Sequence, residues 1–380
     1  MVVARALKWA AGALALALAA WAGSPARAAD LPDVTRKIIS ELKLGESVLD
    51  GLDRELAVPS DWVEAAKAEG QVRLTGSWDA EEFRALSAPF LARYPAIKVN
   101  YTRGSFNARA LRPLIAFQEG RYIADIVTGI GGAMPRYIEA DALDDLRLLP
   151  NANNVIAGMK SERGEWIGIR IRYWCMSYNT NKVKPEELPA TWEDLLTQPR
   201  WRNGHLALAN LPQLWVLPLW GEYGEQWTEH FLKTLFNDVK PQVRKEGANA
   251  VLNLVIAGEF DAAIPSADYR MARYVGRGAP VSWHCPTPLP SAISEMAILK
   301  GSPNIHAARL FANWLLSKEG QIAQFHADRA TPIHKDLQTR DFLIFPDEIA
   351  GKKIAFRDPA LEDDHDEVLK IWNPLWDKVQ

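Results

Sequence analysis

Residues 71–86, which read QVRLTGSWDAEEFRAL, decide the fold class of this chain of 380 residues. The first five alternate between polar and apolar side chains, as a short half-buried strand does, and a glycine-containing turn follows. Phe83 and Leu86 then begin an apolar pattern at helical spacing. Asp79 followed by Glu82 is typical of a capped helix start. The stretch therefore predicts a strand, a turn and a helix in immediate succession.

The same order of elements repeats downstream. Residues 97–101 form a second predicted strand, and a turn and a helix follow it to about Gln118. Residues 125–127 form a third strand before a glycine-rich connection. This alternation predicts a parallel sheet covered by helices, in which ligands bind at the carboxyl ends of the strands. Side chains of the strand-end turns are therefore candidate ligand contacts, although several are also ordinary turn residues: Arg103, Ser105, Thr128 and Gly129.

A second unit of alternating elements follows, in which a predicted helix from about residue 248 stops at Gly258, a suitable C-terminal glycine. The prolines between residues 280 and 290 require an extended path. The predicted strands lie at 173–178, 206–209, 260–264 and 292–299, and the predicted helices at 227–235, 248–257 and 307–315.

The N-terminus has the pattern of a secretory signal peptide. Two basic residues precede an apolar run at residues 9–21, and Ala26 and Ala28 occupy the A-x-A positions of a cleavage site. The run is shorter than the roughly 20 residues that a membrane-spanning helix takes, so cleavage is favoured over an anchor. We predict that residues 1–28 are a cleaved signal peptide and that the mature chain is periplasmic.

Charge distribution excludes a polyanionic partner. The formal net charge is -3 and the Lys and Arg residues are scattered rather than gathered in a basic stripe, so we expect no nucleic-acid binding. The acidic run at residues 362–366 is interpreted as a solvated surface segment.

Cys175 and Cys285 are the only cysteines. An oxidising compartment permits a bridge between them, but two cysteines do not form a disulfide framework in a chain of this size. Two separate buried thiols are the favoured interpretation, and the bridge stays open as the alternative.

Motifs for catalysis and metal binding are absent from the sequence. The seven histidines show no close metal-ligand spacing. There is no G-x-S-x-G elbow, no Walker phosphate loop and no G-x-G-x-x-G after a strand. We therefore predict no catalytic group, no metal site, no cofactor and no enzyme activity.

Six short segments together resemble the type 2 periplasmic binding proteins, in particular the family 1 extracellular solute-binding proteins that include ferric-iron and polyamine binders. Each segment is weak alone, but their order and spacing carry the resemblance over residues 65–335. The segments lie at residues 68–70, 124–127, 172–180, 188–195, 257–261 and 315–321.

The resemblance implies an α/β fold of two lobes that the chain crosses between twice. The crossings are expected near residues 170–178 and 282–290. Residues 65–172 and 286–380 would then form the first lobe and residues 173–285 the second. Residues 29–64 are expected to be an N-terminal helical extension.

Ligand contacts implied by the resemblance lie around the crossing and the strand ends. Ser77 follows the first strand, where helix N-H groups favour an anion, and its alternative role is a helix cap. Trp78 either stacks on the ligand or packs the turn. Arg172 aligns with an arginine that holds an anion in related iron binders, with a structural salt bridge as the alternative. Tyr173 follows it directly, and Asn210 would face the cleft from the second lobe.

One departure from the family argues against iron. Ferric-iron binders of this group present adjacent tyrosines where this chain has Ser266 and Ala267. Tyr269 matches a ligand position less well, and Ser266 and Tyr269 are instead candidate contacts to an organic ligand.

Taken with the resemblance, these features predict a monomeric periplasmic solute-binding protein of an ABC-type importer. It would capture a small organic solute, anionic or zwitterionic, and pass it to a membrane permease. Ferric-ion transport and presentation of a ligand to a membrane sensor are the alternatives, and an enzyme on the same lobes is a further one.

Overall fold

β1 (Gln71–Gly76) and α4 (Ala80–Arg93) form where the quoted stretch predicts them. The backbone N–H of Asp79 donates to the Glu82 carboxylate at 2.9 Å, which satisfies an amide that would otherwise lack a partner at the helix start. The computed structural model describes residues 30–357 and 359–379, so the predicted signal peptide lies outside the described residues. Within the described part of the chain, no helix has the length and apolar character needed to cross a membrane.

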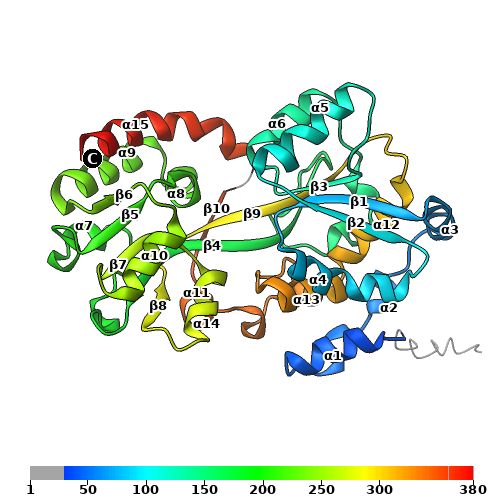
Figure 1. Ribbon diagram of the computed structural model, residues 1–380, viewed down its shortest axis with the longest axis horizontal. Helices are drawn as coiled ribbons and strands as arrows, with labels where there is room; N and C mark the ends of the chain where they lie inside the picture. Colours follow the sequence, from blue (N-terminus) through cyan, green and yellow to red (C-terminus); the bar gives the residue numbers. More distant parts are fainter. Residues whose placement is uncertain (1–29, 358, 380) are drawn as a thin grey trace, which may run out of the picture.

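The first lobe contains a sheet in the order β2-β1-β3-β9-β4. β2 (Lys98–Arg103) and β3 (Ile126–Thr128) pair parallel with β1, as predicted, whereas β9 (Leu289–Ile298) pairs antiparallel with β3. The helices of this lobe lie on both sides of the sheet (Figure 1). They are α4, α5 (Arg112–Gln118), α6 (Met134–Glu139), α12 (Ile305–Leu316) and α13 (Lys318–Asp328).

Two long antiparallel strands, β4 (Ile167–Asn179) and β9, carry the chain between the lobes (Figure 1). β4 pairs with β9 through Tyr173 and then with strands of the second lobe, so one strand belongs to both sheets. The first crossing lies where it was expected. The second begins only at Leu289, because the preceding residues form β8 (Val281–His284), which pairs with β4 inside the second lobe.

The second lobe is built on the other end of β4. Its sheet continues through β7 (Ala262–Ala267), β5 (Leu206–Ala209) and β6 (Gln242–Arg244), of which β5 is parallel to both neighbours. Buried indoles such as Trp192, Trp201 and Trp215 fill its core. Its helices include α7 (Asp194–Thr197), α8 (Val216–Tyr223), α9 (Glu225–Thr234), α10 (Ala248–Ala257) and α11 (Asp268–Val275). Glu348 of the short helix α14 (Pro346–Ile349) accepts the backbone N–H of Cys285.

Cys175 and Cys285 form a disulfide, so the favoured interpretation of two free thiols is wrong. Cys175 lies in β4, and Cys285 directly follows β8, whose His284 pairs with Met176 of β4. This antiparallel register places the two cysteines next to each other although 110 positions separate them in the sequence. A crosslink over that length restricts the unfolded chain and stabilises the fold.

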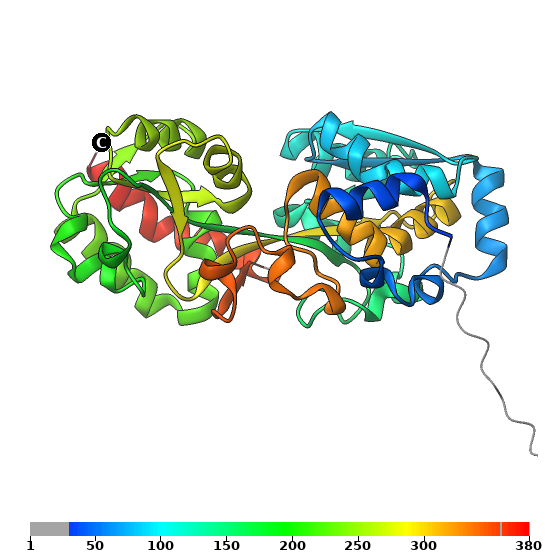
Figure 2. The same cartoon turned by 90° about the horizontal axis from the view of Figure 1, so that it is seen from below.

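The N-terminal extension is helical, as expected, and packs on the first lobe against α12 and α13 (Figure 2). Thr35 donates to Glu319 at 2.6 Å, and Glu55 accepts the backbone N–H of Lys318 at 2.7 Å. Both bonds anchor the extension to the first turn of α13. Its helices are α1 (Asp33–Glu41), α2 (Leu52–Glu55) and α3 (Ser60–Glu69), so the helical part continues past the predicted boundary at residue 64.

The C-terminal helix α15 (His365–Lys378) packs on the second lobe (Figure 1). Trp372 and Trp376 are buried in the same core as Trp215. Residues 286–380 were expected to complete the first lobe, and this helix departs from that division because its two indoles fill the second-lobe core. The other predicted lobe boundaries stay predictions.

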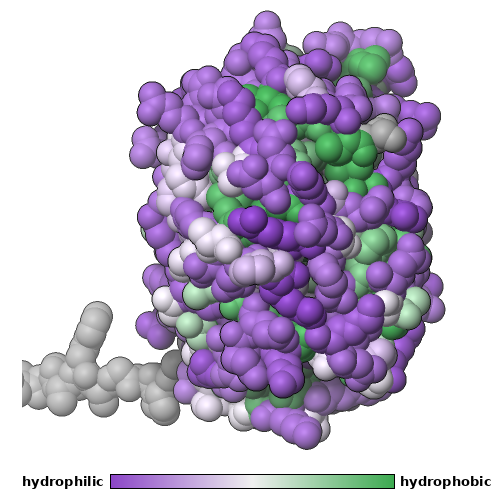
Figure 3. All heavy atoms as spheres, turned by 90° about the vertical axis from the view of Figure 1, so that its left-hand side faces the viewer, coloured by the Kyte–Doolittle hydropathy of each residue, from purple (hydrophilic) through white to green (hydrophobic). Residues whose placement is uncertain are grey.

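The outer end of the second lobe has a mostly hydrophilic surface (Figure 3). Apolar residues appear there as patches separated by polar side chains. Scattered apolar patches of this kind are normal on a folded protein.

Trp372→Ala is expected to lower the free energy of unfolding by about 3–5 kcal/mol, because the substitution leaves a cavity in the second-lobe core. Urea unfolding followed by circular dichroism measures the change. The matched control is Ile115→Ala, whose side chain is 51% exposed and should change stability by only about 0.5 kcal/mol. An effect of Trp372→Ala as small as the control would contradict the docking of α15.

Candidate functional site

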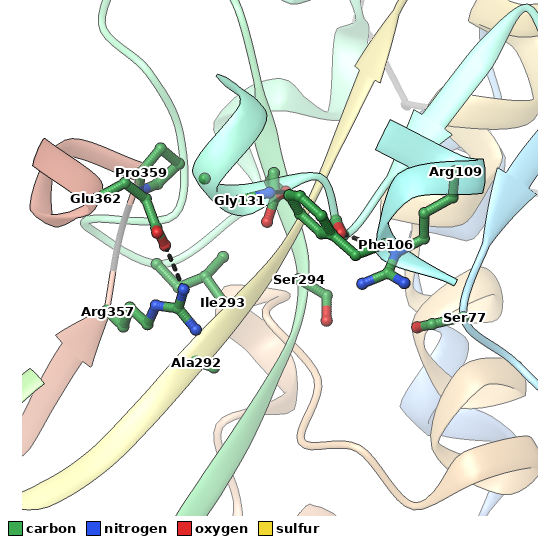
Figure 4. Close-up of a pocket in the computed structure, with 13 residues that line it drawn as sticks. Ser77, Phe106, Arg109, Gly131, Ala292, Ile293, Ser294, Arg357, Pro359 and Glu362 are labelled. Atoms are coloured by element: carbon green, nitrogen blue, oxygen red, sulfur yellow. Dashed lines mark hydrogen bonds and ion pairs between the residues drawn. The ribbon is translucent and has the colours of Figure 1, made fainter. Parts of the chain in front are cut away.

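A polar cavity of about 170 Å³ lies at the carboxyl ends of β1 and β3, beside the crossing strand β9 (Figure 4). This is the edge of the sheet where the strand order predicted a ligand site. Residues from the first lobe, from β9 and from the C-terminal segment line it: Ser77, Phe106, Arg109, Gly129, Gly131, Gly132, Ala292, Ile293, Ser294, Glu295, Arg357, Pro359 and Glu362.

Arg109 supplies the positive charge on the first-lobe side of this cavity. Its Nε donates to the carbonyl of Gly129 at 2.9 Å, and its Nη1 donates to the carbonyl of Gly104 at 3.2 Å. These bonds fix the guanidinium, which points into the same cavity as Ser77 and Ser294 (Figure 4). Among the described residues no carboxylate forms an ion pair with Arg109, so its charge is available to a ligand.

Arg357 and Glu362 form the opposite wall (Figure 4). Arg357 Nη2 lies 2.7 Å from a carboxylate oxygen of Glu362. Nearby, the buried Glu295 accepts the backbone N–H of Gly131. Burial raises the pKa of Glu295, and the negative charge of Glu362 adds to the rise. The acidic run was interpreted as a solvated surface segment, which is wrong for Glu362, because its carboxylate is mostly buried against the cavity.

Behind Ser77, two arginines of β4 share one carboxylate. Asp328 at the end of α13 accepts hydrogen bonds from Arg170 and from Arg172, the latter at 2.9 Å. Arg170 also donates to Ser77 Oγ at 3.1 Å and to Ser294 Oγ at 3.2 Å. Complete burial lowers the pKa of Arg170 to about 10, and the adjacent Arg172 contributes. Arg170 therefore holds two cavity hydroxyls in place from behind.

Arg172 has the structural salt bridge that was its alternative role. Its guanidinium also lies 3.9 Å from the centre of the Tyr269 ring, a cation–π contact. One donor, Nη1, is buried without a hydrogen-bond partner in the described part of the chain. Contact between Arg172 and a ligand stays a prediction.

The other first-lobe candidates differ in whether they line the cavity. Gly129 lines the cavity. Trp78 is fully buried beneath the guanidinium of Arg170, at 4.2 Å, so it packs the turn. Thr128 is buried and donates to the carbonyl of Thr75. Arg103 and Ser105 are exposed, and Arg103 forms an ion pair with Asp79 at 3.0 Å.

The second-lobe candidates lie outside this cavity. Tyr173 is buried, and desolvation raises the pKa of its phenol. Ser266 is buried and donates to Ser177 Oγ at 2.8 Å. Asn210 is exposed, and its side-chain Oδ1 accepts a hydrogen bond from Trp372 Nε1 at 2.8 Å. Tyr269 is half-buried beside Arg172.

Several cavity residues were missed from the sequence: Phe106, Arg109, Ser294, Glu295, Arg357 and Glu362. The turn after β2 was a candidate region, and Arg109 lies just beyond the residues chosen from it. Nothing in the local pattern indicates Arg357 or Glu362, because the C-terminal segment reaches the cavity only through tertiary packing.

Three potential metal-ligating groups meet away from this cavity. Ligand atoms of Glu55, His334 and Asp336 lie within 4.8 Å of one another. The ammonium of Lys318 is 3.5 Å from both carboxylates. Since this cation already offsets their charge, we assign no metal site to the cluster.

Two α/β lobes, two crossing strands and a polar cavity at the strand ends define a two-lobed binding protein of the type 2 periplasmic fold. The profile of the family described as bacterial extracellular solute-binding protein matches residues 76–322. This match covers more than half of the chain, and the chain belongs to that family.

Similar proteins differ in how much of the chain they cover. An uncharacterized protein of Haemophilus influenzae is 32% identical over 154 residues, a match that spans 37% of this chain and 41% of that protein. Iron-bound HitA from Pseudomonas aeruginosa is 22% identical with a TM-score of 0.62, covering 80% of this chain and 99% of HitA. AfuA from Actinobacillus pleuropneumoniae, solved with fructose-6-phosphate, is 18% identical with a TM-score of 0.62, covering 81% and 99%. At these identities the two structures support the fold alone.

Asp268→Asn is expected to stabilise the protein above about pH 7 and to have a smaller effect near pH 4. Burial raises the pKa of Asp268 to about 7, whereas an Asp in the unfolded chain titrates near about 3.9. Between these values the folded protein keeps a proton that the unfolded chain releases. Wild-type stability should therefore fall as the pH rises through this window and level off above it.

Urea unfolding of the wild type and of Asp268→Asn across this pH range tests the expectation. Asparagine has no charge to bury, so the difference between the proteins should grow with pH. The exposed Asp377→Asn is the control and should show no such growth. A pH-independent difference for Asp268→Asn would show that the carboxyl ionises normally in the fold.

Proposed function

We propose that this protein reversibly captures a small organic solute with an anionic group in the cleft between its lobes. The closed, loaded form would then dock on the membrane permease of an ABC-type importer. The single observation that carries the proposal is Arg109, a partly buried guanidinium that faces the cavity with no carboxylate partner among the described residues.

The groups around Arg109 suit a carboxylate or a phosphate. A guanidinium held by two backbone carbonyls keeps its planar donor fork in a fixed direction, and such a fork matches two oxygens of one anion. The hydroxyls of Ser77 and Ser294 can donate to the same anion. Because Arg170 holds both hydroxyls, little side-chain freedom would be lost on binding.

Closure of the lobes about β4 and β9 would complete the site. Asn210 is the second-lobe residue best prepared for this role. Its side-chain oxygen already accepts a hydrogen bond from Trp372, so its side-chain NH₂ is left as a donor for a ligand oxygen.

Ferric iron is the alternative ligand, and the iron-bound neighbour makes it relevant. Hard ferric ion favours anionic oxygen donors. Ser266 is engaged with Ser177, Ala267 offers no donor, and the guanidinium of Arg172 lies over Tyr269. A fixed cation beside the remaining phenol would repel a metal ion, so the organic ligand is favoured.

Native mass spectrometry of freshly purified protein should detect a retained small molecule that carries a carboxylate or a phosphate. Arg109→Gln should weaken the binding of that molecule at least about tenfold, because charge-assisted hydrogen bonds are lost. Arg84→Gln, an exposed arginine on α4, is the matched control. Retention of a purely cationic or apolar molecule, or unchanged affinity in Arg109→Gln, would reject the proposal.

Titration of metal-free protein with chelated ferric ion should produce no strong tyrosinate charge-transfer band, because the adjacent phenolates of iron binders are absent. Visible absorption is the measurement, and Tyr269→Phe is the variant that assigns any band. A strong band that disappears in Tyr269→Phe would show that the protein binds ferric iron and would contradict the proposal of an organic ligand.

A further inference from the structure

The cavity described above has two poles of opposite charge. Arg109 stands at one end beside Ser77, and Glu362 stands at the other (Figure 4). The carboxylate of Glu295 also lines the cavity, and the negative charge of Glu362 contributes to raising its pKa. Arg357 is the remaining ionisable group of the lining. With two guanidiniums and two carboxylates, the lining is formally neutral but strongly polarised.

Glu362 and Glu295 together carry more negative charge than the guanidinium of Arg357 offsets. Arg357 pairs with Glu362 at 2.7 Å, but no ion pair joins it to Glu295 in the described chain. Glu295 is only 2% exposed and has the backbone N–H of Gly131 as a neutral donor. One buried carboxylate of the lining therefore has no ion pair among the described residues, and Arg357 and Arg109 act on it only at longer range. This arrangement is costly unless a ligand supplies further positive charge.

Glycines keep this pole open. A Cβ atom added to Gly132 would lie 3.0 Å from Glu362 Oε2, and one added to Gly131 would lie 3.5 Å from Oε1. Any larger side chain at Gly132 would crowd the carboxylate and compete for the space in front of it.

We infer that the solute is a small zwitterion, whose anionic group binds at Arg109 and whose ammonium group binds at Glu362 and Glu295. The inference rests on the proposed function and narrows its ligand class. A molecule with opposite charges at its ends matches both poles. An anion of the same size without the ammonium would instead place an apolar end against two carboxylates and leave their excess charge unpaired.

Glu362 is the residue that sets this preference. It lies in the C-terminal segment, outside residues 76–322 that the family profile matches. Glu295 is held in β9 by its backbone and by Gly131, whereas Glu362 reaches the cavity from the segment that follows β10 (Ile354–Arg357). The C-terminal segment thus supplies Glu362, the carboxylate that selects for the ammonium group of the solute.

Isothermal titration of protein dialysed free of retained ligand tests the inference with two matched pairs of probes. O-phosphoethanolamine is compared with ethyl phosphate, and 3-aminopropanoate with propanoate, so each pair differs only in the ammonium. In at least one pair the zwitterion should bind at least about tenfold tighter. Which pair responds tells whether the anionic group is a phosphate or a carboxylate.

Glu362→Gln should reduce that preference to less than about threefold by weakening the zwitterion, since the amide keeps a hydrogen bond to Arg357 but has no charge. The control Glu367→Gln removes an exposed carboxylate from α15 and should keep the preference.

The inference is overturned if anion and zwitterion bind equally in both pairs, if Glu362→Gln keeps the full preference, or if no probe binds. Equal binding that Arg109→Gln abolishes would leave the proposed function standing. Retention of a purely anionic molecule through purification would also leave the proposed function standing. Failure of this inference and failure of the proposed function are therefore distinguishable.

Discussion

The carboxylate of Asp328 is the interaction on which the cleft depends. It is fully buried at the end of α13 and accepts hydrogen bonds from Arg170 and Arg172, which lie two positions apart and so on the same face of β4. Removing one partner of such a buried group leaves charge uncompensated, at a cost of about 3–5 kcal/mol. Since Arg170 also holds Ser77 and Ser294, one carboxylate fixes both the crossing strand and two hydroxyls of the cavity.

This arrangement divides the arginines of the cleft into two kinds. Arg170 and Arg172 both form ion pairs with Asp328, and each lies over an aromatic ring, Trp78 or Tyr269. Arg109 donates to two backbone carbonyls, lies over the Phe106 ring and forms no ion pair with a carboxylate of the described residues. Arg109 lines the cavity and Arg172 does not, so Arg109 is better suited to the ligand than Arg172, the arginine that the family resemblance indicates.

Local sequence patterns predicted the elements that depend on local physics. The strand, turn and helix after Gln71 formed where period and capping placed them, because hydrophobic spacing reports which face each element buries. The disulfide, the docking of α15 and the acidic pole of the cavity depend on segments that meet only in three dimensions. Nothing in the spacing of Cys175 and Cys285 reports the register of β8 on β4, and nothing near Glu362 indicates a cavity. Family resemblance supplied the two crossings, but the second-lobe candidates it indicated do not line the cavity.

The C-terminal segment links the ligand site to the hinge. β10 pairs with the crossing strand β9, and the turn at residues 359–364 contacts the Gly131–Ala133 turn of the first lobe. Leu361 of the same turn packs against Gly221 of α8, where a Cβ would come within 2.7 Å of it. α15 is held in the second lobe by Trp372 and Trp376. A rotation of the second lobe about β4 and β9 would therefore carry α15 with it. The same rotation would move Glu362 relative to the first-lobe wall of the cavity. Ligand contact at Glu362 and lobe closure therefore act on the same segment.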